Sequence, residues 1–122
     1  MTLAEFQARL REHAGPVVVD CWAPWCGPCR SMAPVLAEVE VAYIGRVDVW
    51  KIDVDTEPEV AAALGVRVIP TLIAFHGERE VTRMAGAASH RRLRSLFEQA
   101  VTGVAVERGM ETRDRAMRAV AG

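Results

Sequence analysis

The stretch Trp25-Cys26-Gly27-Pro28-Cys29 follows closely on an apolar run, Val17-Val18-Val19-Asp20-Cys21-Trp22. β-Branched valines favour a buried strand. Pro28 suits the first turn of a helix, where the missing N–H of proline would have no partner in the helix anyway. The sequence therefore predicts a central strand over 17–22 that ends just before the two cysteines, and a helix that begins among them.

A cysteine at a helix N-terminus faces unpaired N–H groups and the positive end of the helix dipole, and both favour the thiolate. A free thiol, with a pKa of about 8.5, is only about 3% ionised at pH 7, and lowering the pKa by about 1.5 units makes it half ionised. We therefore expect Cys26 to be the exposed nucleophile. Cys29, one turn deeper, is the candidate resolving thiol that breaks a mixed disulfide.

Two cysteines at this spacing also occur in zinc sites and at haem attachment sites. The chain has three cysteines and three histidines, and we expect His13, His76 and His90 to lie in unrelated places on the surface. Because a second pair of ligands is absent, we predict no metal site.

The motif becomes more specific together with Asp20-Cys21-Trp22-Ala23-Pro24 before it and Ile69-Pro70-Thr71 about forty residues later. In these features the sequence resembles the thioredoxin family, from about Leu3 to Val101. The resemblance implies an α/β fold, the thioredoxin fold, with a central mixed sheet flanked by helices.

Hydrophobic periodicity and turn residues place the elements of this fold along the chain. A capping box, Thr56 to Glu59, opens a short helix that Gly65 closes, and Gly77 joins the last two strands into a hairpin. There is almost no room before the first helix for the short edge strand that thioredoxins commonly carry, so we predict a sheet of about four strands. The other predicted helices are 3–13, 28–44 and 89–101, and the predicted strands are 17–22, 47–53, 72–76 and 80–85.

We expect residues 1–103 to form the domain and residues 104–122 to extend beyond the family pattern. The extension carries only a loose apolar stripe, interrupted by Gly109. A disordered tail, a docked helix and a dimer contact are all compatible with that stripe, and we favour a frayed helix or tail.

Asp20 and Lys51 are charged residues within predicted strands. A buried carboxylate is unfavourable unless it has a partner or a task, and a structural, hydrogen-bonded aspartate is the simpler reading. The resemblance assigns Asp20 to the buried acid that accepts the proton of Cys29, and burial should raise its pKa towards the working pH. By the same resemblance Lys51 approaches Asp20, although a lysine that reaches solvent at the sheet edge is the alternative.

Cys21 departs from the family, which usually has a bulky aromatic residue at this position. It follows Asp20 along the strand, so its side chain should point to the opposite face of the sheet. We interpret Cys21 as a small buried hydrophobic residue, with a third redox thiol as the minor alternative. The smaller side chain leaves core volume for Trp50 or the C-terminal extension to fill.

The resemblance also implies a flat, largely apolar substrate surface in which backbone pairing supplies most of the contact. X–Pro bonds are cis in only about 5–6% of cases, whereas the family has a cis proline packed against the cysteines, so we expect a cis bond before Pro70. The residues of this surface would be Trp25, Gly27, Pro28, Ile69, Pro70, Gly86 and Ala87.

We therefore predict a thiol–disulfide oxidoreductase that reduces protein disulfides through Cys26 and Cys29, since Gly-Pro between the cysteines accompanies reducing behaviour in this family. The resemblance implies no bound cofactor. NADPH would act only through a partner, thioredoxin reductase, and the substrates would be disulfide-containing proteins. The alternative is a binding or chaperone module that uses the substrate groove and the C-terminal extension.

Composition narrows the class of protein further. The chain has 122 residues, 51% of them hydrophobic, and a formal net charge of −1. This size suits one domain, and the charge gives no reason to expect nucleic acid or an anionic membrane as a partner. The first residues show neither the basic nor the apolar part of a signal peptide, so we expect a cytoplasmic protein, as a monomer.

Overall fold

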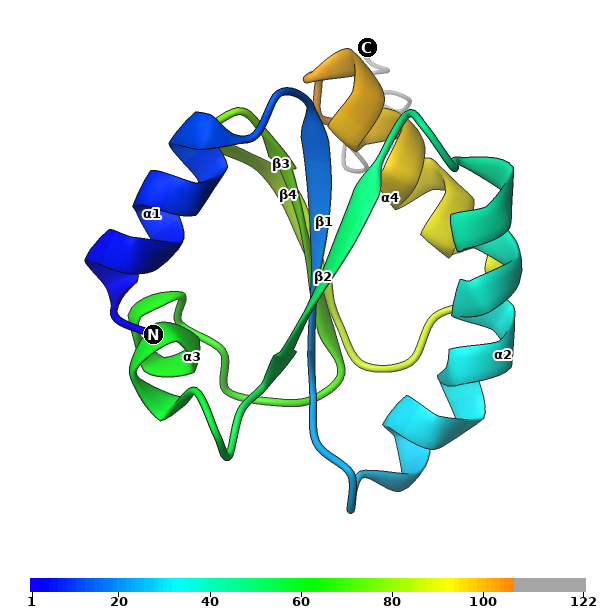
Figure 1. Cartoon of the computed structure of the whole chain (residues 1–122). Coiled ribbons are helices and arrows are strands. Elements are labelled where there is room, and N and C mark those ends of the chain that lie inside the picture. Colours follow the sequence, from blue (N-terminus) through cyan, green and yellow to red (C-terminus); the bar gives the residue numbers. More distant parts are fainter. Residues whose placement is uncertain (107–122) are drawn as a thin grey trace, which may run out of the picture.

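A four-stranded sheet with the strand order β2-β1-β3-β4 runs through the centre of the computed structural model, which describes residues 1–106 (Figure 1). The central strand β1, Pro16–Trp22, pairs in parallel with β2, Asp48–Asp53, and antiparallel with β3, Thr71–His76. The edge strand β4, Arg79–Ala85, pairs antiparallel with β3. The predicted mixed sheet of four strands is confirmed.

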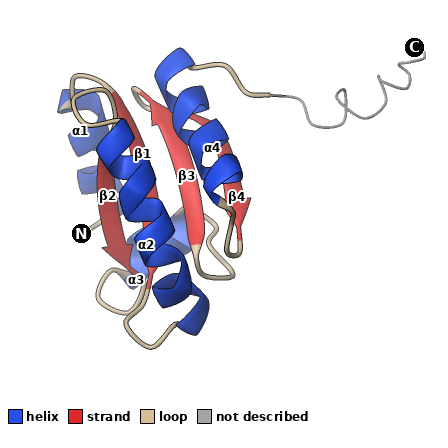
Figure 2. Cartoon of the chain, turned by 90° about the vertical axis from the view of Figure 1, so that its right-hand side faces the viewer, coloured by secondary structure: helices blue, strands red, loops and turns tan. Residues whose placement is uncertain are grey.

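Two helices cover each face of the sheet. The helices α1, Leu3–Glu12, and α3, Pro58–Ala63, lie on one side, and α2, Gly27–Ala42, and α4, His90–Thr102, lie on the other (Figure 1). Figure 2 views the protein from the side of α2 and α4, with both helices in front of the strands. Because both faces of β1 are covered, its inner residues are all buried, and all of them except Asp20 are apolar.

The sheet separates the two largest clusters of the core. Val18 belongs to the cluster under α2 and α4, where the predicted inward residues of α4, Leu93, Leu96, Phe97 and Ala100, are all buried. Cys21 belongs to the cluster under α1 and α3, together with Phe6 and Leu10. Trp50 packs against this second cluster, edge-on to Phe6 with ring centroids 6.1 Å apart.

The helix ends explain one error of the prediction. Thr56 does not cap α3, because Pro58 begins the helix and Glu57 therefore occupies the cap position, without a side-chain hydrogen bond. The Thr56 hydroxyl donates instead to the carbonyl oxygen of Asp53, at 3.3 Å. The capping box of this fold lies at the start of α1, where the Thr2 side chain and Glu5 bond reciprocally to each other's backbone N–H.

Gly103 ends the last helix. It adopts a left-handed conformation with φ +74°, and a Cβ there would lie 3.0 Å from the His76 ring, so a side chain is disfavoured on two grounds. The extension begins directly after this cap. Our prediction of a frayed helix or tail falls mostly on residues 107–122, which lie outside the described part. Within residues 1–106, no helix has the length and apolar character needed to cross a bilayer.

Candidate active site

The two cysteines lie where β1 passes into α2. The Cys26 N–H donates to the Ala23 carbonyl oxygen at 3.1 Å, which closes the turn, and Cys26 is the N-cap residue of the 16-residue helix α2. Cys26 and Cys29 form a disulfide with their Cα atoms 5.3 Å apart. The predicted junction of strand and helix is therefore confirmed.

The backbone of α2 already holds a donor against the first sulfur. The Cys29 N–H points at Cys26 Sγ from 3.2 Å, and the first turn of α2 contains no acidic residue. In the reduced protein this N–H and the helix dipole favour a thiolate on Cys26, since both place positive potential at its sulfur.

We expected Cys26 to be the more exposed cysteine of the pair, and this expectation is wrong. Cys26 is 4% exposed and Cys29 is 7% exposed, so Cys26 is not the more open residue of the pair. Trp22 and Ile69 pack against the small cluster that both cysteines form with Ala23, and this contact covers Cys26 as well. The cysteines differ instead in what surrounds them, because only Cys29 lines the cavity described next.

A cavity of about 240 Å³ lies behind Cys29 and contains Asp20. Asp20 is 6% exposed, and its Oδ1 has no hydrogen-bond partner among the described residues. Burial raises the pKa of the Asp20 carboxyl, while the nearby ammonium of Lys51 opposes the rise. The lining is largely apolar, but a cavity of this size has room for a water molecule beside the unpartnered Asp20 oxygen. The lining residues are Asp20, Trp22, Cys29, Arg30, Ala33, Leu36 and Lys51.

Lys51 lies opposite Asp20 in the register of β1 and β2, and its Nζ is 3.3 Å from Asp20 Oδ2. The same Nζ is 3.7 Å from Oε2 of Glu40, on α2. Half of the lysine side chain is exposed. The pairing with Asp20 and the position at the sheet edge, which we weighed as alternatives, therefore occur together.

The predicted substrate-surface residues converge on the disulfide from three segments. The Ile69–Pro70 peptide bond is cis, as expected, and the Ile69 carbonyl oxygen lies 3.8 Å from Cys26 Sγ. Gly86 donates its N–H to the Pro70 carbonyl oxygen at 2.7 Å, which brings the end of β4 to the same place. Ala87 follows Gly86 and is exposed, while Gly27 and Pro28 form the first residues of α2.

Trp25 is a large exposed apolar residue of this surface, with 65% exposure. Its indole Nε1–H donates to Asp55 Oδ2 at 2.6 Å, which fixes the ring beside the motif. We did not predict Asp55. It lies in an acidic segment after β2, and nothing in the spacing of that segment indicates a tryptophan 30 residues earlier as its partner.

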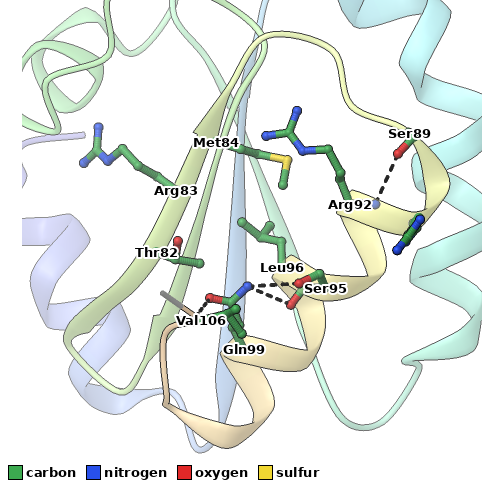
Figure 3. Close-up of a pocket in the computed structure, with 10 residues that line it drawn as sticks. Thr82, Arg83, Met84, Ser89, Arg92, Ser95, Leu96, Gln99 and Val106 are labelled. Carbon is green, nitrogen blue, oxygen red and sulfur yellow. Dashed lines mark hydrogen bonds between the residues drawn. The ribbon is translucent and has the colours of Figure 1, made fainter. Parts of the chain in front are cut away.

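A second hollow lies away from the disulfide. It has a volume of about 520 Å³ and lies between β4 and α4 (Figure 3). Polar and basic side chains such as Arg83, Arg92 and Gln99 line it, and none of the predicted site residues does. Among residues 1–106 there is no group of three or more histidine, cysteine or acidic residues that is able to hold a metal ion.

Comparison with known proteins places this site in a family. The family model for thioredoxin matches residues 1–99, a segment that includes the cysteine motif, Asp20, Lys51 and the cis proline. The chain belongs to the thioredoxin family. It is therefore a thioredoxin-type thiol–disulfide oxidoreductase, a protein disulfide reductase whose redox group is the Cys26–Cys29 disulfide rather than a bound cofactor.

Three relatives illustrate the match. Thioredoxin 1 of Nostoc sp. is 40% identical over 99 residues, which cover 81% of this chain and 92% of the relative. The thioredoxin of Synechocystis sp. is 43% identical over 96 residues, 79% of this chain and 90% of the relative. A bifunctional thioredoxin reductase/thioredoxin of Mycobacterium leprae is 46% identical over 87 residues, 71% of this chain but 19% of the relative.

Proposed function

We propose that Cys26 is the attacking thiolate and Cys29 the resolving thiol of a reductive cycle. The Cys26 thiolate attacks one sulfur of a substrate disulfide, a mixed disulfide forms, and the other substrate sulfur leaves as a thiolate. Cys29 then attacks Cys26 Sγ, the first substrate sulfur leaves, and the protein keeps the Cys26–Cys29 disulfide. Two electrons pass from the protein to the substrate. The observation that carries this assignment is the Cys29 N–H held 3.2 Å from Cys26 Sγ.

In this cycle Asp20 accepts the proton of Cys29, and Lys51 adjusts how readily it does so. The shared cavity supports this role, because it joins Cys29 to Asp20 and leaves Oδ1 free to bond a water between them. A raised pKa suits a carboxylate that must take up a proton near neutral pH.

The surface around Trp25, Ile69, Pro70 and Gly86 would bind an extended segment of the substrate. The backbone of Ile69 lies next to the disulfide, so a substrate strand that pairs with it places its own sulfur near Cys26. Trp25, held by Asp55, supplies an apolar wall to this surface. Gly27, Pro28 and Ala87 border it and set no strong side-chain preference.

We further propose a cytoplasmic monomer with residues 1–103 as its domain, which a thioredoxin reductase regenerates with electrons from NADPH. The Mycobacterium leprae relative supports such a partner, because its name joins the two activities in one chain. In this setting the Cys26/Cys29 couple should be more reducing than glutathione, whose cytosolic potential is about −220 to −260 mV by biochemical extraction.

Trapping the intermediate tests the assignment of the two thiols. The reduced Cys29→Ser variant, mixed with insulin, should accumulate a covalent adduct through residue 26 that mass spectrometry of peptides identifies. The Cys26→Ser variant should form at most a few per cent of an adduct, because its remaining motif thiol lacks the donated N–H. An adduct that forms equally well through Cys29 would contradict the assigned roles.

A further inference from the structure

One ammonium group lies within ion-pair distance of two carboxylates at the edge of the candidate active site. Lys51 Nζ is 3.3 Å from Asp20 Oδ2 and 3.7 Å from Glu40 Oε2. The three side chains come from three elements, β2, β1 and α2, so the fold brings them together. The two carboxylates differ in depth, since the Asp20 side chain is 8% exposed and that of Glu40 is 32% exposed.

The shared ammonium limits how strongly Lys51 pairs with Asp20. A distance of 3.3 Å is longer than a normal charge-assisted hydrogen bond of about 2.7–2.9 Å, and the Glu40 carboxylate attracts the same Nζ from 3.7 Å. The other basic residue that lines the cavity, Arg30, donates to the Pro24 carbonyl oxygen at 2.9 Å instead. Among the described residues, Lys51 is therefore the cation that pairs with Asp20, and Glu40 competes for it.

We propose that Glu40 is a positioning residue that holds Lys51 back from Asp20 and so keeps Asp20 a strong enough base to take up the proton of Cys29. This inference rests on the role proposed above for Asp20. Glu40 touches neither the disulfide nor the cavity beside it, so it acts through Lys51. Its own negative charge works in the same direction, because it also disfavours a second negative charge on Asp20.

The test is a titration of the Asp20 carboxyl in the oxidised protein, followed by the ¹³C chemical shift of Asp20 Cγ. In Glu40→Gln the Lys51 ammonium pairs with Asp20 alone, so the titration midpoint of Asp20 should fall by about half a pH unit. The expected shift is small because Glu40 is partly exposed and solvent screens its charge. The rate at which a preformed mixed disulfide on Cys26 is resolved should show its pH midpoint lowered by a similar amount.

Glu38→Gln is the matched control. Glu38 lies on the same helix, is largely exposed and approaches His90 at 3.8 Å rather than Lys51. The same change of charge there should move the Asp20 midpoint by less than about a fifth of the Glu40→Gln shift, because its charge is more distant and solvated. Equal shifts in the two variants would show a general charge effect and overturn the proposal.

The Lys51→Met variant distinguishes an effect of Glu40 that acts through Lys51 from direct repulsion between the Glu40 and Asp20 carboxylates. In this background Glu40→Gln should move the Asp20 midpoint by less than half of the shift it produces beside Lys51. A shift that persists in full, or no shift in the original background, would overturn the proposal. The carboxyl titration is independent of catalysis, so it judges Glu40 even if Asp20→Asn leaves the resolving step unchanged and thereby refutes the role assigned to Asp20.

Discussion

Asp20 and Cys21 are neighbours on one strand, but their side chains lie on opposite faces of the sheet and have different surroundings. Both are almost fully buried, at 6% and 0% exposure, and burial is the main cause that raises the pKa of each side chain. Asp20 faces a cavity and an ammonium group that opposes the rise. Cys21 faces the packed cluster under α1 and α3, and its pKa is raised to about 12.

This difference shows that burial alone keeps an ionisable side chain neutral. A buried side chain takes part in proton transfer or thiol exchange only when a second feature of the structure acts on it. For Asp20 the second feature is Lys51 with an unpartnered oxygen in a cavity. For Cys26 it is the Cys29 N–H at the start of α2. Cys21, in the middle of β1, has neither. We therefore read Cys21 as a core residue and the motif cysteines as the reactive ones.

The largest effect expected from this comparison is in thiol reactivity. In the reduced protein at pH 7, iodoacetamide should modify Cys26 at least about 100-fold faster than Cys21. At a pKa of about 12 only about one Cys21 thiol in 10⁵ is ionised at this pH. The stronger intrinsic nucleophilicity of a high-pKa thiolate recovers only part of that factor.

Peptide mass spectrometry with isotopically labelled reagent measures both rates in one sample. The same comparison in about 6 M guanidinium chloride is the control, because unfolding removes burial and the helix N-terminus, and the two rates should then agree within a few-fold. Comparable modification rates of Cys26 and Cys21 in the folded protein would contradict the interpretation of Cys21 as an unreactive core residue.

A smaller effect is expected in the pH dependence of stability. Burial raises the folded-state pKa of Asp20 above the unfolded value of 3.8, so folding favours the protonated form. The contribution of this group to stability is then fully present below pH 3.8 and is lost as the pH rises through the folded-state pKa. Asp20→Asn removes the buried charge, and it should exceed the original protein in stability by on the order of 1–2 kcal/mol at pH 8.

Urea unfolding of the oxidised proteins from pH 3 to pH 9 measures the difference. The free energies of unfolding of the two proteins should converge at the lowest pH, where Asp20 is protonated in both the folded and the unfolded state. A variant that is less stable at pH 8 would show that the pairing of Asp20 with Lys51 outweighs the cost of burial. In that case the cavity would have to be more polar than its lining suggests.

The features that the sequence predicted well are those that depend on local chemistry. The valine run indicates the central strand, and Pro28 between the two cysteines indicates the start of the helix. The cis bond before Pro70 is different, because local statistics favour trans and only the resemblance indicated cis.

The features that the sequence did not predict depend on distances between separate elements. Glu40 is an ordinary polar position of α2, and only the packing of α2 against β2 brings it to Lys51. The bond from Trp25 to Asp55 spans 30 residues in the same way. Relative exposure of the cysteines likewise depends on Trp22 and Ile69, which pack against them. The capping error at Thr56 is different, because it is local: a shift of a single residue moves the cap to Glu57.

The smallest expected effect concerns a charge pair on the same side of the sheet as Cys21. His13 Nε2 lies 2.6 Å from Asp48 Oδ2, and this bond is the main cause that raises the pKa of His13 above 6.5. Its contribution is present below pH 6.5 and is lost as the pH rises through the folded-state pKa. Because Asp48 is 62% exposed, the contribution should stay below about 1 kcal/mol.

Asp48→Asn removes the charge but leaves His13 packed edge-on against Trp50, with ring centroids 5.5 Å apart. Urea unfolding at pH 5.5 and pH 8.5 should therefore show a smaller loss of stability on raising the pH than in the original protein, while the exposed Glu12→Gln control keeps the full loss. An unchanged loss in Asp48→Asn would mean that solvent screens this pair completely. The contrast would then be stronger than we expect, because the charge of the buried Asp20 would affect stability and the charge of the exposed Asp48 would not.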